Sequence, residues 1–213
     1  MKKIALGIVV LLSSMLVTGC TLFQPVKAVN TNTYALDTQF EQVSAGAGSL
    51  TLLVNIPIAL PGFNTPKMIY IKKLHEIDYF SQNQWIDSPA RMLSPLLVQA
   101  HEKSGKYRAV VQVRSAAKAD LRLDTEVIRM QHEFLAQPSQ VRLTIRAQLI
   151  NLRENIVLAT REFDVAEDAP SDDPYGGVIA ANRAVKIILQ QIADFSAQES
   201  TAVKSQKVES STH

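Results

Sequence analysis

The sequence is poor in cysteine, with a single residue of this kind, Cys20, among its 213. Without a second thiol it cannot form an intramolecular disulfide, so the folded part must be stabilised by a packed core. The sequence also has no strong charge of one sign, because 22 basic side chains face 20 acidic ones. Nucleic-acid-binding proteins carry a basic excess clustered on one face, and this pattern is missing here. We therefore expect no nucleic-acid partner.

The residue spacings of metal and catalytic sites are also missing. Four histidines lie far apart, in different predicted elements and with no cysteine partner: His75, His101, His132 and His213. We expect His101, which ends a predicted helix, to lie at the surface. Asp172 and Asp173 precede a predicted helix, where capping explains them better than acid–base chemistry. Because no Gly-x-Ser-x-Gly elbow is present either, we predict no catalytic residue, no metal ligand and no enzymatic activity.

The first twenty residues follow the order of a secretory signal, with a charged start, an apolar run and small residues. Two lysines precede an apolar stretch over residues 4–17, which is too short to span a bilayer as a mature helix. Val17-Thr18-Gly19-Cys20 then fits the lipobox of bacterial lipoproteins. The pattern predicts removal of residues 1–19 as a signal peptide and attachment of a diacylglyceryl group to the thiol of Cys20. An ordinary signal peptide ahead of a free thiol is the alternative.

Two segments have compositions typical of chain without regular structure. Residues 20–47 mix Pro, Asn, Ser and Gly with no sustained period, which predicts the lipidated cysteine followed by a flexible tether. Residues 197–213 are rich in Ser, Gln, Lys and Thr, which predicts a disordered tail. A single folded domain should then occupy residues 48–196. Thr21, a residue other than Asp after the cysteine, favours sorting to the outer membrane.

Hydrophobic periodicity predicts strands along most of this domain. They are a strand over residues 49–57, a hairpin over 68–72 and 77–80, a strand over 107–113 and a meander over 121–129, 141–151 and 156–165. The middle strand of the meander alternates, with Val141, Leu143, Ile145, Ala147 and Leu149 on one face. This alternation predicts one buried face and one face in water.

Two further segments have the apolar spacing of amphipathic helices. The first has Ser88 at its N-cap and Pro89 at the first helical position, and it ends near Gly105. The second runs from near Pro174 to about Ala197 with a continuous apolar stripe. Two main helices covering about five or six strands predict a single α/β domain with a mixed, largely antiparallel sheet.

The stretch from Tyr79 to Leu93 contains the only tryptophan, Trp85, close to two other aromatic residues. Large aromatic side chains usually lie in a core, so one interpretation is that Trp85 and Tyr79 pack the hairpin against the first helix. The other interpretation is that part of this cluster stays exposed as a contact for a partner or a lipid, because Trp and Tyr are enriched at binding hot spots.

Four segments combine aromatic, proline and apolar residues: Val54-x-Ile56-Pro57, Met68-Ile69-Tyr70, Tyr79-Phe80-x4-Trp85-x3-Pro89-x2-Met92-Leu93 and Ala119-Asp120-Leu121. As a set they resemble the ABC-type transport auxiliary lipoprotein family (PqiC-like) over about residues 48–196, together with the lipobox. Many relatives have Tyr-Tyr-Ala where this chain has Tyr79-Phe80-Ser81. On this resemblance the candidate partner-binding or family-motif residues are Tyr70, Tyr79, Phe80, Trp85, Pro89 and Leu93.

The resemblance implies a fold similar to the amino-terminal domain of TolB. It also implies a role beside a permease, an ATPase and an MCE-domain protein that together move lipids between two membranes. The lipoprotein would lie on the periplasmic face of the outer membrane and dock the MCE-domain protein, in some cases as a homo-oligomeric ring. No cofactor is implied beyond the covalent lipid on Cys20. The rival hypothesis is a carrier lipoprotein that holds a lipid or another small molecule in an apolar cavity.

Overall fold

The computed structural model describes residues 30–43, 48–113 and 117–210, with side chains described as far as Thr201. Thr31–His213 form one compact unit, and Met1–Asn30 form a second one of which only Asn30 is described. The predicted signal peptide and Cys20 therefore lie outside the described residues. Within those residues, no helix combines the length and the apolarity that a membrane crossing requires.

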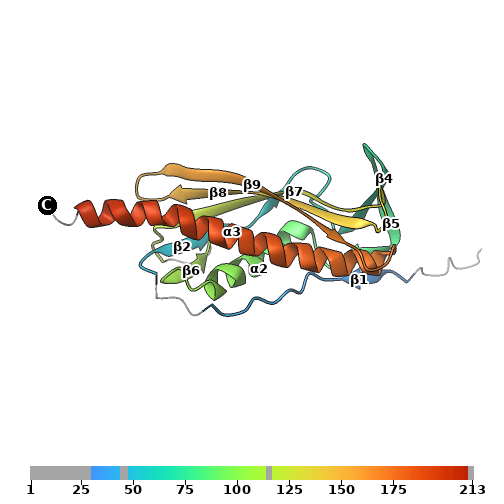
Figure 1. The fold of residues 1–213 in the computed structure, drawn as a ribbon, viewed down its shortest axis with the longest axis horizontal. Coiled ribbons are helices and arrows are strands. Elements are labelled where there is room, and N and C mark those ends of the chain that lie inside the picture. The colour runs from blue at the N-terminus through green and yellow to red at the C-terminus, as the bar shows by residue number, and fades with distance from the viewer. Residues whose placement is uncertain (1–29, 44–47, 114–116, 211–213) are drawn as a thin grey trace, which may run out of the picture. The chain divides into compact units, whose positions relative to one another are not determined.

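The described residues contain nine strands, all in one mixed sheet, and two helices (Figure 1). The strands are β1 (Asn32–Tyr34), β2 (Thr51–Val54), β3 (Ile58–Ala59), β4 (Lys67–Lys73), β5 (Glu76–Trp85), β6 (Ala109–Gln112), β7 (Leu121–Glu133), β8 (Gln140–Asn151) and β9 (Ile156–Asp168). The helices are α2 (Pro89–Lys103) and α3 (Pro174–Ser210). The predicted α/β class is confirmed, although the sheet has more strands than the five or six expected.

Strand β7 is the centre of the sheet, because both of its edges are paired along its length. One edge pairs antiparallel with β8, and β8 in turn pairs antiparallel with β9. The other edge pairs successively with three short parallel strands, β2, β3 and β4. The sheet continues from β2 to β6 near the start of β7, and from β4 through β5 to β1 near its end.

A β-bulge between Val127 and Arg129 changes which residues of β7 face the core. Leu123 and Val127 are buried before it, whereas Met130 and His132 are the residues buried against the core after it. A bulge adds one unpaired residue to one strand, so the alternation of side chains between the two faces shifts by one position. The shift turns His132 towards the helix side of the sheet.

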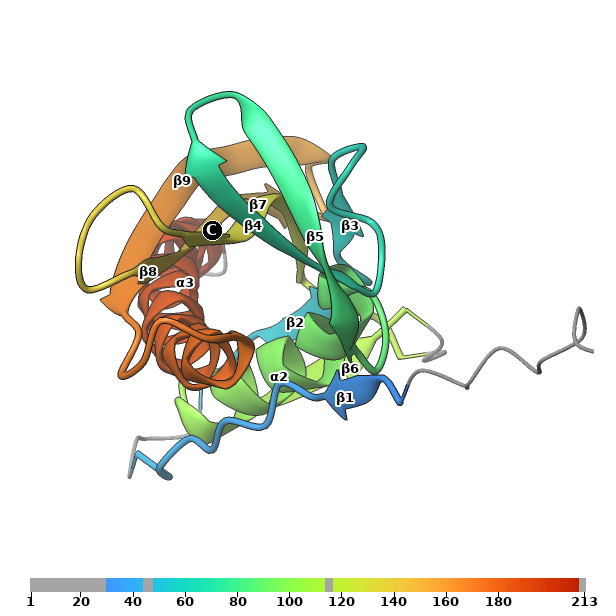
Figure 2. The same ribbon diagram turned by 90° about the vertical axis from the view of Figure 1, so that its right-hand side faces the viewer.

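Both helices lie on the same side of the sheet, and the core lies between them and the strands (Figure 2). Helix α3 packs against β8 and β9, helix α2 packs against β6 and β7, and the two helices contact one another. The predicted apolar stripe of α3 is buried, with Ala184, Val185, Ile188 and Leu189 all fully covered. The predicted inner face of β8 is buried in the same way, which confirms the alternation seen in the sequence.

Residues 31–43 pack against the domain, so the prediction of a flexible tether over residues 20–47 is wrong for this part. Strand β1 pairs in parallel with β5, and Leu36 lies in the core. The backbone N–H of Asp37 donates to Oδ1 of Asn182 at 2.7 Å, and that of Val43 donates to the carbonyl of Lys103 at 3.0 Å. The connection between Cys20 and the fold is therefore no longer than residues 21–31.

Helix α3 continues to Ser210, so residues 197–210 are helical where the composition predicted a disordered tail. Ser196 and Ser200 are buried, and each hydroxyl donates a hydrogen bond to the helix backbone, to Ile192 and Ala197. Serine can satisfy its hydroxyl on a preceding carbonyl in this way, which allows a polar sequence to continue along a packed helix.

The two helices begin differently. Ser88 is at the N-cap of α2 as predicted, but its hydroxyl is buried without a partner, and only its carbonyl accepts bonds from Arg91 and Met92. At the start of α3, Oδ1 of Asp173 accepts the N–H of Gly176 at 2.8 Å, and Oδ1 of Asp172 accepts the N–H of Ser139. The capping interpretation is therefore confirmed for Asp173, whereas Asp172 binds the backbone just before β8 and does not cap α3.

His101 is fully buried in α2, so the prediction that it lies at the surface is wrong. Its Nδ1 donates a hydrogen bond of 2.7 Å to the carbonyl of Leu97, and its ring lies beside Tyr107. Burial lowers the pKa of His101 to about 4, although the hydrogen bond to Leu97 opposes this shift. The helical period places His101 one turn after Leu97 and on the same face of α2. We expected it at the surface because histidine is polar.

If the stripe of α3 forms the core, truncation within it should destabilise the protein far more than truncation beside it. Leu189→Ala, at a fully buried position, should lower the free energy of unfolding by about 2–5 kcal/mol. Ile187→Ala is the matched control, because that side chain is 38 % exposed. It should lower the same quantity by about 1 kcal/mol or less. Urea unfolding followed by circular dichroism measures both, and equal losses would contradict the assigned packing.

Burial of His101 should make the protein less stable as the pH falls from about 6.5 to about 4. In this window the unfolded state takes up a proton, while the folded state keeps His101 neutral. The expected loss from this residue is on the order of 3 kcal/mol. The variant His101→Asn should lose that part of the pH dependence, and His75→Asn, at an exposed turn, should keep it. An unchanged pH profile of unfolding in His101→Asn would refute the assignment.

Candidate functional site

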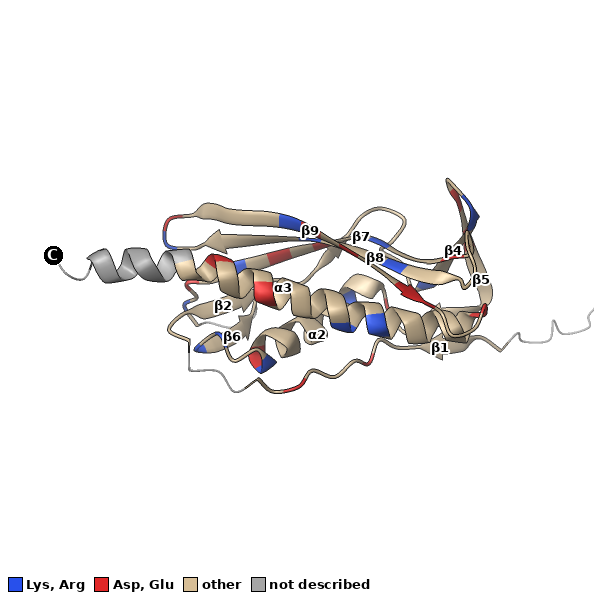
Figure 3. Ribbon diagram, viewed as in Figure 1, with Lys and Arg blue, Asp and Glu red and all other residues tan. Residues whose placement is uncertain are grey.

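Strands β7, β8 and β9 carry charged residues of both signs (Figure 3), and the residues of β8 that alternate with its buried ones include two arginines. Arg146 on β8 is central among these charges, since one of its nitrogens lies 3.0 Å from Glu126 on β7 and another lies 3.3 Å from Glu162 on β9. Exposed ion pairs of this kind stabilise a fold by about 1 kcal/mol at most. Their main effect here is to hold side chains of three strands in a fixed arrangement.

A second arginine of β8 repeats this arrangement closer to the end of β7. Arg142 lies 3.2 Å from Glu133 on β7 and 2.6 Å from Asp164 on β9, and the hydroxyl of Thr144 also donates to Asp164. Partial burial alone would raise the pKa of Asp164, but the hydrogen bonds from Thr144 and Arg142 outweigh it and hold that pKa below its usual range. This carboxylate therefore stays charged in the folded protein.

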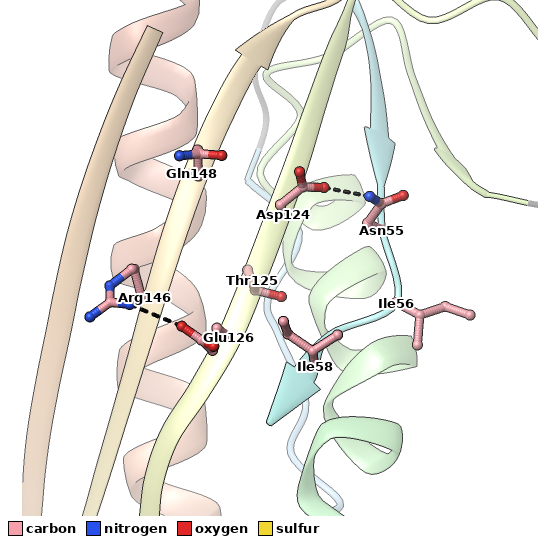
Figure 4. Close-up of a pocket in the computed structure, with 8 residues that line it drawn as sticks. All are labelled: Asn55, Ile56, Ile58, Asp124, Thr125, Glu126, Arg146 and Gln148. Atoms are coloured by element: carbon pink, nitrogen blue, oxygen red, sulfur yellow. Dashed lines mark hydrogen bonds and ion pairs between the residues drawn. The ribbon is translucent and has the colours of Figure 1, made fainter. Parts of the chain in front are cut away.

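A cleft of about 390 Å³ opens beside Arg146, and we call it the sheet cleft (Figure 4). It is lined by Asn55, Ile56, Ile58, Asp124, Thr125, Glu126, Arg146 and Gln148. The cleft exists because β2 ends at Val54 and β3 begins at Ile58, and the chain between them bends away from β7. Proline has no N–H for a sheet ladder, so Pro57 favours this interruption between the two strands.

The two isoleucines of the sheet cleft are unusually exposed, Ile56 at 55 % and Ile58 at 63 %. On the opposite side lie the polar side chains of Arg146 and Gln148, as Figure 4 shows. The amide nitrogen of Asn55 donates to Asp124, which fixes the floor of the cleft. Exposed apolar side chains surrounded by ordered polar groups are the usual composition of a protein-binding surface.

The polar side chains of the sheet cleft are mostly engaged with one another. No histidine, cysteine, serine or lysine lines the cleft, and its acidic groups are hydrogen-bonded to Asn55 or paired with Arg146. Across the described residues, no three His, Cys, Asp or Glu side chains are placed to hold a metal ion. The arrangement can bind another surface, and the hydroxyl of Thr125, the one alcohol that lines the cleft, is buried without a hydrogen-bond partner.

A second concave surface lies under the β4–β5 hairpin, and we call it the aromatic groove. Its volume is about 490 Å³, and it is lined by Tyr70, Lys72, Tyr79, Phe80, Ser81, Phe134 and Asp172. The rings of Tyr70 and Phe80 are 4.5 Å apart between centroids, and Phe134 stands edge-on to Tyr70 at 6.0 Å. Such contacts between rings add stability beyond the burial of area, so the groove has a rigid base.

His132 supports this base from the core side. Its ring lies 4.2 Å from that of Phe134, its Nε2 lies 2.8 Å from the hydroxyl of Ser139, and its Nδ1 is buried without a partner. Burial lowers the pKa of His132, while the charges of Asp172 and Asp173 oppose the shift. A Cβ at Gly177 would stand 2.5 Å from Nδ1, so only glycine allows α3 to approach this closely.

The structure separates the six candidate residues of the sequence into two groups. Three meet at the aromatic groove: Tyr70, Tyr79 and Phe80. Three are buried in the domain: Trp85, Pro89 and Leu93. Burial of Trp85 agrees with the core interpretation of the aromatic stretch, and exposure of Tyr79 at 42 % agrees with the alternative. A binding role for any of the six stays a prediction.

Sequence reasoning missed Ile58, Arg146, Phe134 and His132 as members of these surfaces. Ile58 has the pattern of an ordinary strand residue, and only the neighbouring Pro57 could have signalled that the strand is interrupted there. Phe134 and His132 come together with Phe80 through the pairing of β4 with the end of β7. No local pattern in the sequence reports that pairing.

Comparison with solved structures shows that the fold is shared. The protein XCC0632 from Xanthomonas campestris, a DUF330 protein, is similar with a TM-score of 0.73 at 21 % identity, covering 82 % of this chain and 99 % of that one. A crystal structure of an uncharacterized protein is similar with a TM-score of 0.63 at 13 % identity, covering 78 % of this chain and 97 % of that one. No curated protein matches the sequence.

Comparison with protein families identifies the chain. The model of the ABC-type transport auxiliary lipoprotein component matches residues 34–193, which is most of the folded unit. The match begins at Tyr34 in β1, so it includes residues 34–47, which were predicted to belong to the tether. The chain belongs to the family of ABC-type transport auxiliary lipoprotein components.

Proposed function

We propose that this protein is a non-enzymatic adaptor of an ABC-type lipid transport system. A lipid on Cys20 anchors it to the periplasmic face of the outer membrane, and its domain docks an MCE-domain protein, in the manner the family implies. A ring of subunits is part of the same proposal. Family membership supports the auxiliary role, and the anchor is supported by the lipobox at residues 17–20.

The sheet cleft is the observation that carries the docking part of the proposal. Its two exposed isoleucines stand on a sheet whose other face is covered by α2 behind β3 and by α3 behind β8 and β9, so binding requires little ordering of the protein. Apolar anchors on a rigid surface give most of the affinity of an interface, and surrounding polar groups give its specificity. Arg146 and Gln148 are in the position of such a polar rim.

The rival hypothesis of a lipid carrier has less support in the packing. The cavity between the sheet and α3, lined by Trp85, Met130 and His132 among others, has a volume of about 10 Å³. That is room for about one water molecule and not for an acyl chain. The sheet cleft, the aromatic groove and two further concavities of about 350 and 400 Å³ beside the later part of α3 are all open surface features. We therefore favour docking of a protein over enclosure of a lipid.

Docking through the sheet cleft predicts that Ile58→Asp abolishes co-purification with the MCE-domain partner. Loss of an interface anchor costs about 2 kcal/mol or more, a fall in affinity on the order of 30-fold. Because Ile58 is 63 % exposed, its substitution should leave the thermal unfolding temperature nearly unchanged. Ile187→Asp, on the outer side of α3, is the matched control and should still co-purify. Full retention of the partner by Ile58→Asp would refute this docking surface.

The anchor predicts a clear difference in fractionation. Wild-type protein should stay in the membrane pellet after a wash with concentrated salt, because several acyl chains hold a protein firmly. Protein exported behind a cleavable signal, with Cys20→Ser, should be released by the same wash. Intact mass spectrometry of the pelleted protein should show an acylated Cys20 as the first residue. A free thiol in membrane-derived protein would rule out the anchor.

A further inference from the structure

The β4–β5 hairpin ends in an exposed apolar tip. Leu74 in the turn is 65 % exposed, Ile77 is 48 % exposed, and Tyr79 follows on the same strand. The hairpin reaches beyond the strand to which it is attached, because β4 pairs with β7 only at Tyr70 and Ile71. Figure 1 shows it at the end of the sheet opposite the β8–β9 turn. Large apolar side chains at the end of such a projection are not covered by any described part of the chain.

Charged residues of both signs flank this tip, and the nearest are Lys72, Lys73, Glu76 and Asp78. The hairpin carries three exposed lysines and two acidic residues: Lys67, Lys72, Lys73, Glu76 and Asp78. One of the acids, Glu76, is paired with Lys73 at 3.5 Å. The ammonium of Lys67 lies over the ring of Tyr79 at 4.8 Å from its centroid, and that of Lys72 lies over Tyr70 at 5.3 Å. Tyrosine with lysine beside an apolar tip is the composition of segments at a membrane–water interface.

The entry of the chain into the fold is close to this tip. Strand β1 runs parallel to β5, with Asn32 opposite Asn83, so the residues before Asn32 lie on the side of the hairpin turn. From Asn83 to Glu76 the distance along the strand is about 23 Å. The twelve residues from Cys20 to Asn32 reach at most about 40 Å. Acyl chains on Cys20 and the hairpin tip can therefore reach one bilayer together.

The opposite end of the sheet is less accessible to the same bilayer. Ile156 and Val157 are also exposed apolar residues, at the start of β9. They lie near the first residue of β7, since Leu121 pairs with Asn151 and Asn151 pairs with Ile156. That point is about 36 Å along β7 from the place where the hairpin joins it. A nearly extended tether would be required to bring this end to the membrane.

We propose that the tip of the β4–β5 hairpin is a second, non-covalent membrane contact. Leu74 and Ile77 enter the interfacial layer of the bilayer that holds the lipid of Cys20, and Lys72 and Lys73 face anionic headgroups. This inference rests on the lipid anchor of the proposed function, which keeps the hairpin close to the bilayer. Because a covalent tether alone leaves the domain free to turn, the second contact fixes its orientation and presents the sheet cleft away from the lipid.

The test uses the full lipidated protein, reconstituted into vesicles of phosphatidylethanolamine and phosphatidylglycerol. Because lipidation consumes the thiol of Cys20, a cysteine introduced by L74C is the only site for an environment-sensitive fluorophore. The label should shift its emission to the blue and be quenched by lipids that carry a nitroxide on the acyl chain. The matched control is N155C, in the β8–β9 turn, whose label should keep the emission it has in water.

The contribution of the lysine charges to the membrane contact is tested by adding K72Q and K73Q to the L74C protein. Each lysine near an anionic surface contributes about a fivefold increase in local membrane affinity, so quenching should fall in the triple variant. The same fall should occur when neutral phosphatidylcholine replaces the anionic vesicles. Emission of labelled L74C equal to that of N155C, in protein with an acylated Cys20, would overturn the hairpin contact while leaving the anchor intact.

A failure of the lipid anchor can be distinguished from a failure of the hairpin contact. Mass spectrometry would then show an unmodified Cys20, and the hairpin is judged with C20S/L74C protein mixed with the same anionic vesicles. Quenching of that label supports a membrane contact that does not need the anchor. Absence of quenching refutes the contact.

Discussion

The double pairing of β7 is the constraint on which the rest of the structure depends. One of its edges pairs with β8 along the whole strand. The other edge pairs in succession with β2, β3 and β4. The sheet cleft lies where the chain passes from the first of these strands to the second, and the hairpin leaves from the third. One long strand therefore sets both the places and the separation of the two exposed surfaces.

The bulge in β7 and the helix α3 act together at the hairpin end. By shifting the alternation of side chains, the bulge places His132 between the aromatic residues of the groove and Gly177 of α3. The aromatic groove is then supported by packing and not by a loop, and its rings stay fixed relative to the sheet. Docking of β1 on β5 adds the start of the domain to this same end, where the ring of Tyr34 lies 6.2 Å from that of Tyr175 at the start of α3.

Much of this architecture could be predicted from the sequence, because apolar periodicity reports which face of an element is buried. The hairpin, α2, the meander and the stripe of α3 all follow from it, as does the core position of Trp85. Periodicity does not report which distant element covers that face. Docking of β1, burial of His101 beside Tyr107 and the helical continuation after Ala197 depend on such contacts, so they were missed. The sheet cleft was missed for a related reason, since a gap between two strands leaves no pattern in either.

Two exposed surfaces of one rigid domain thus have different proposed partners, a protein at the sheet cleft and lipid at the hairpin tip. Photo-crosslinking in intact cells tests this directly, with a photoreactive amino acid placed at Ile58 in one strain and at Ile77 in another. We expect an adduct with a second protein from position 58. From position 77 we expect an adduct with lipid and none with protein. Protein adducts from position 77 with none from position 58 would contradict this assignment.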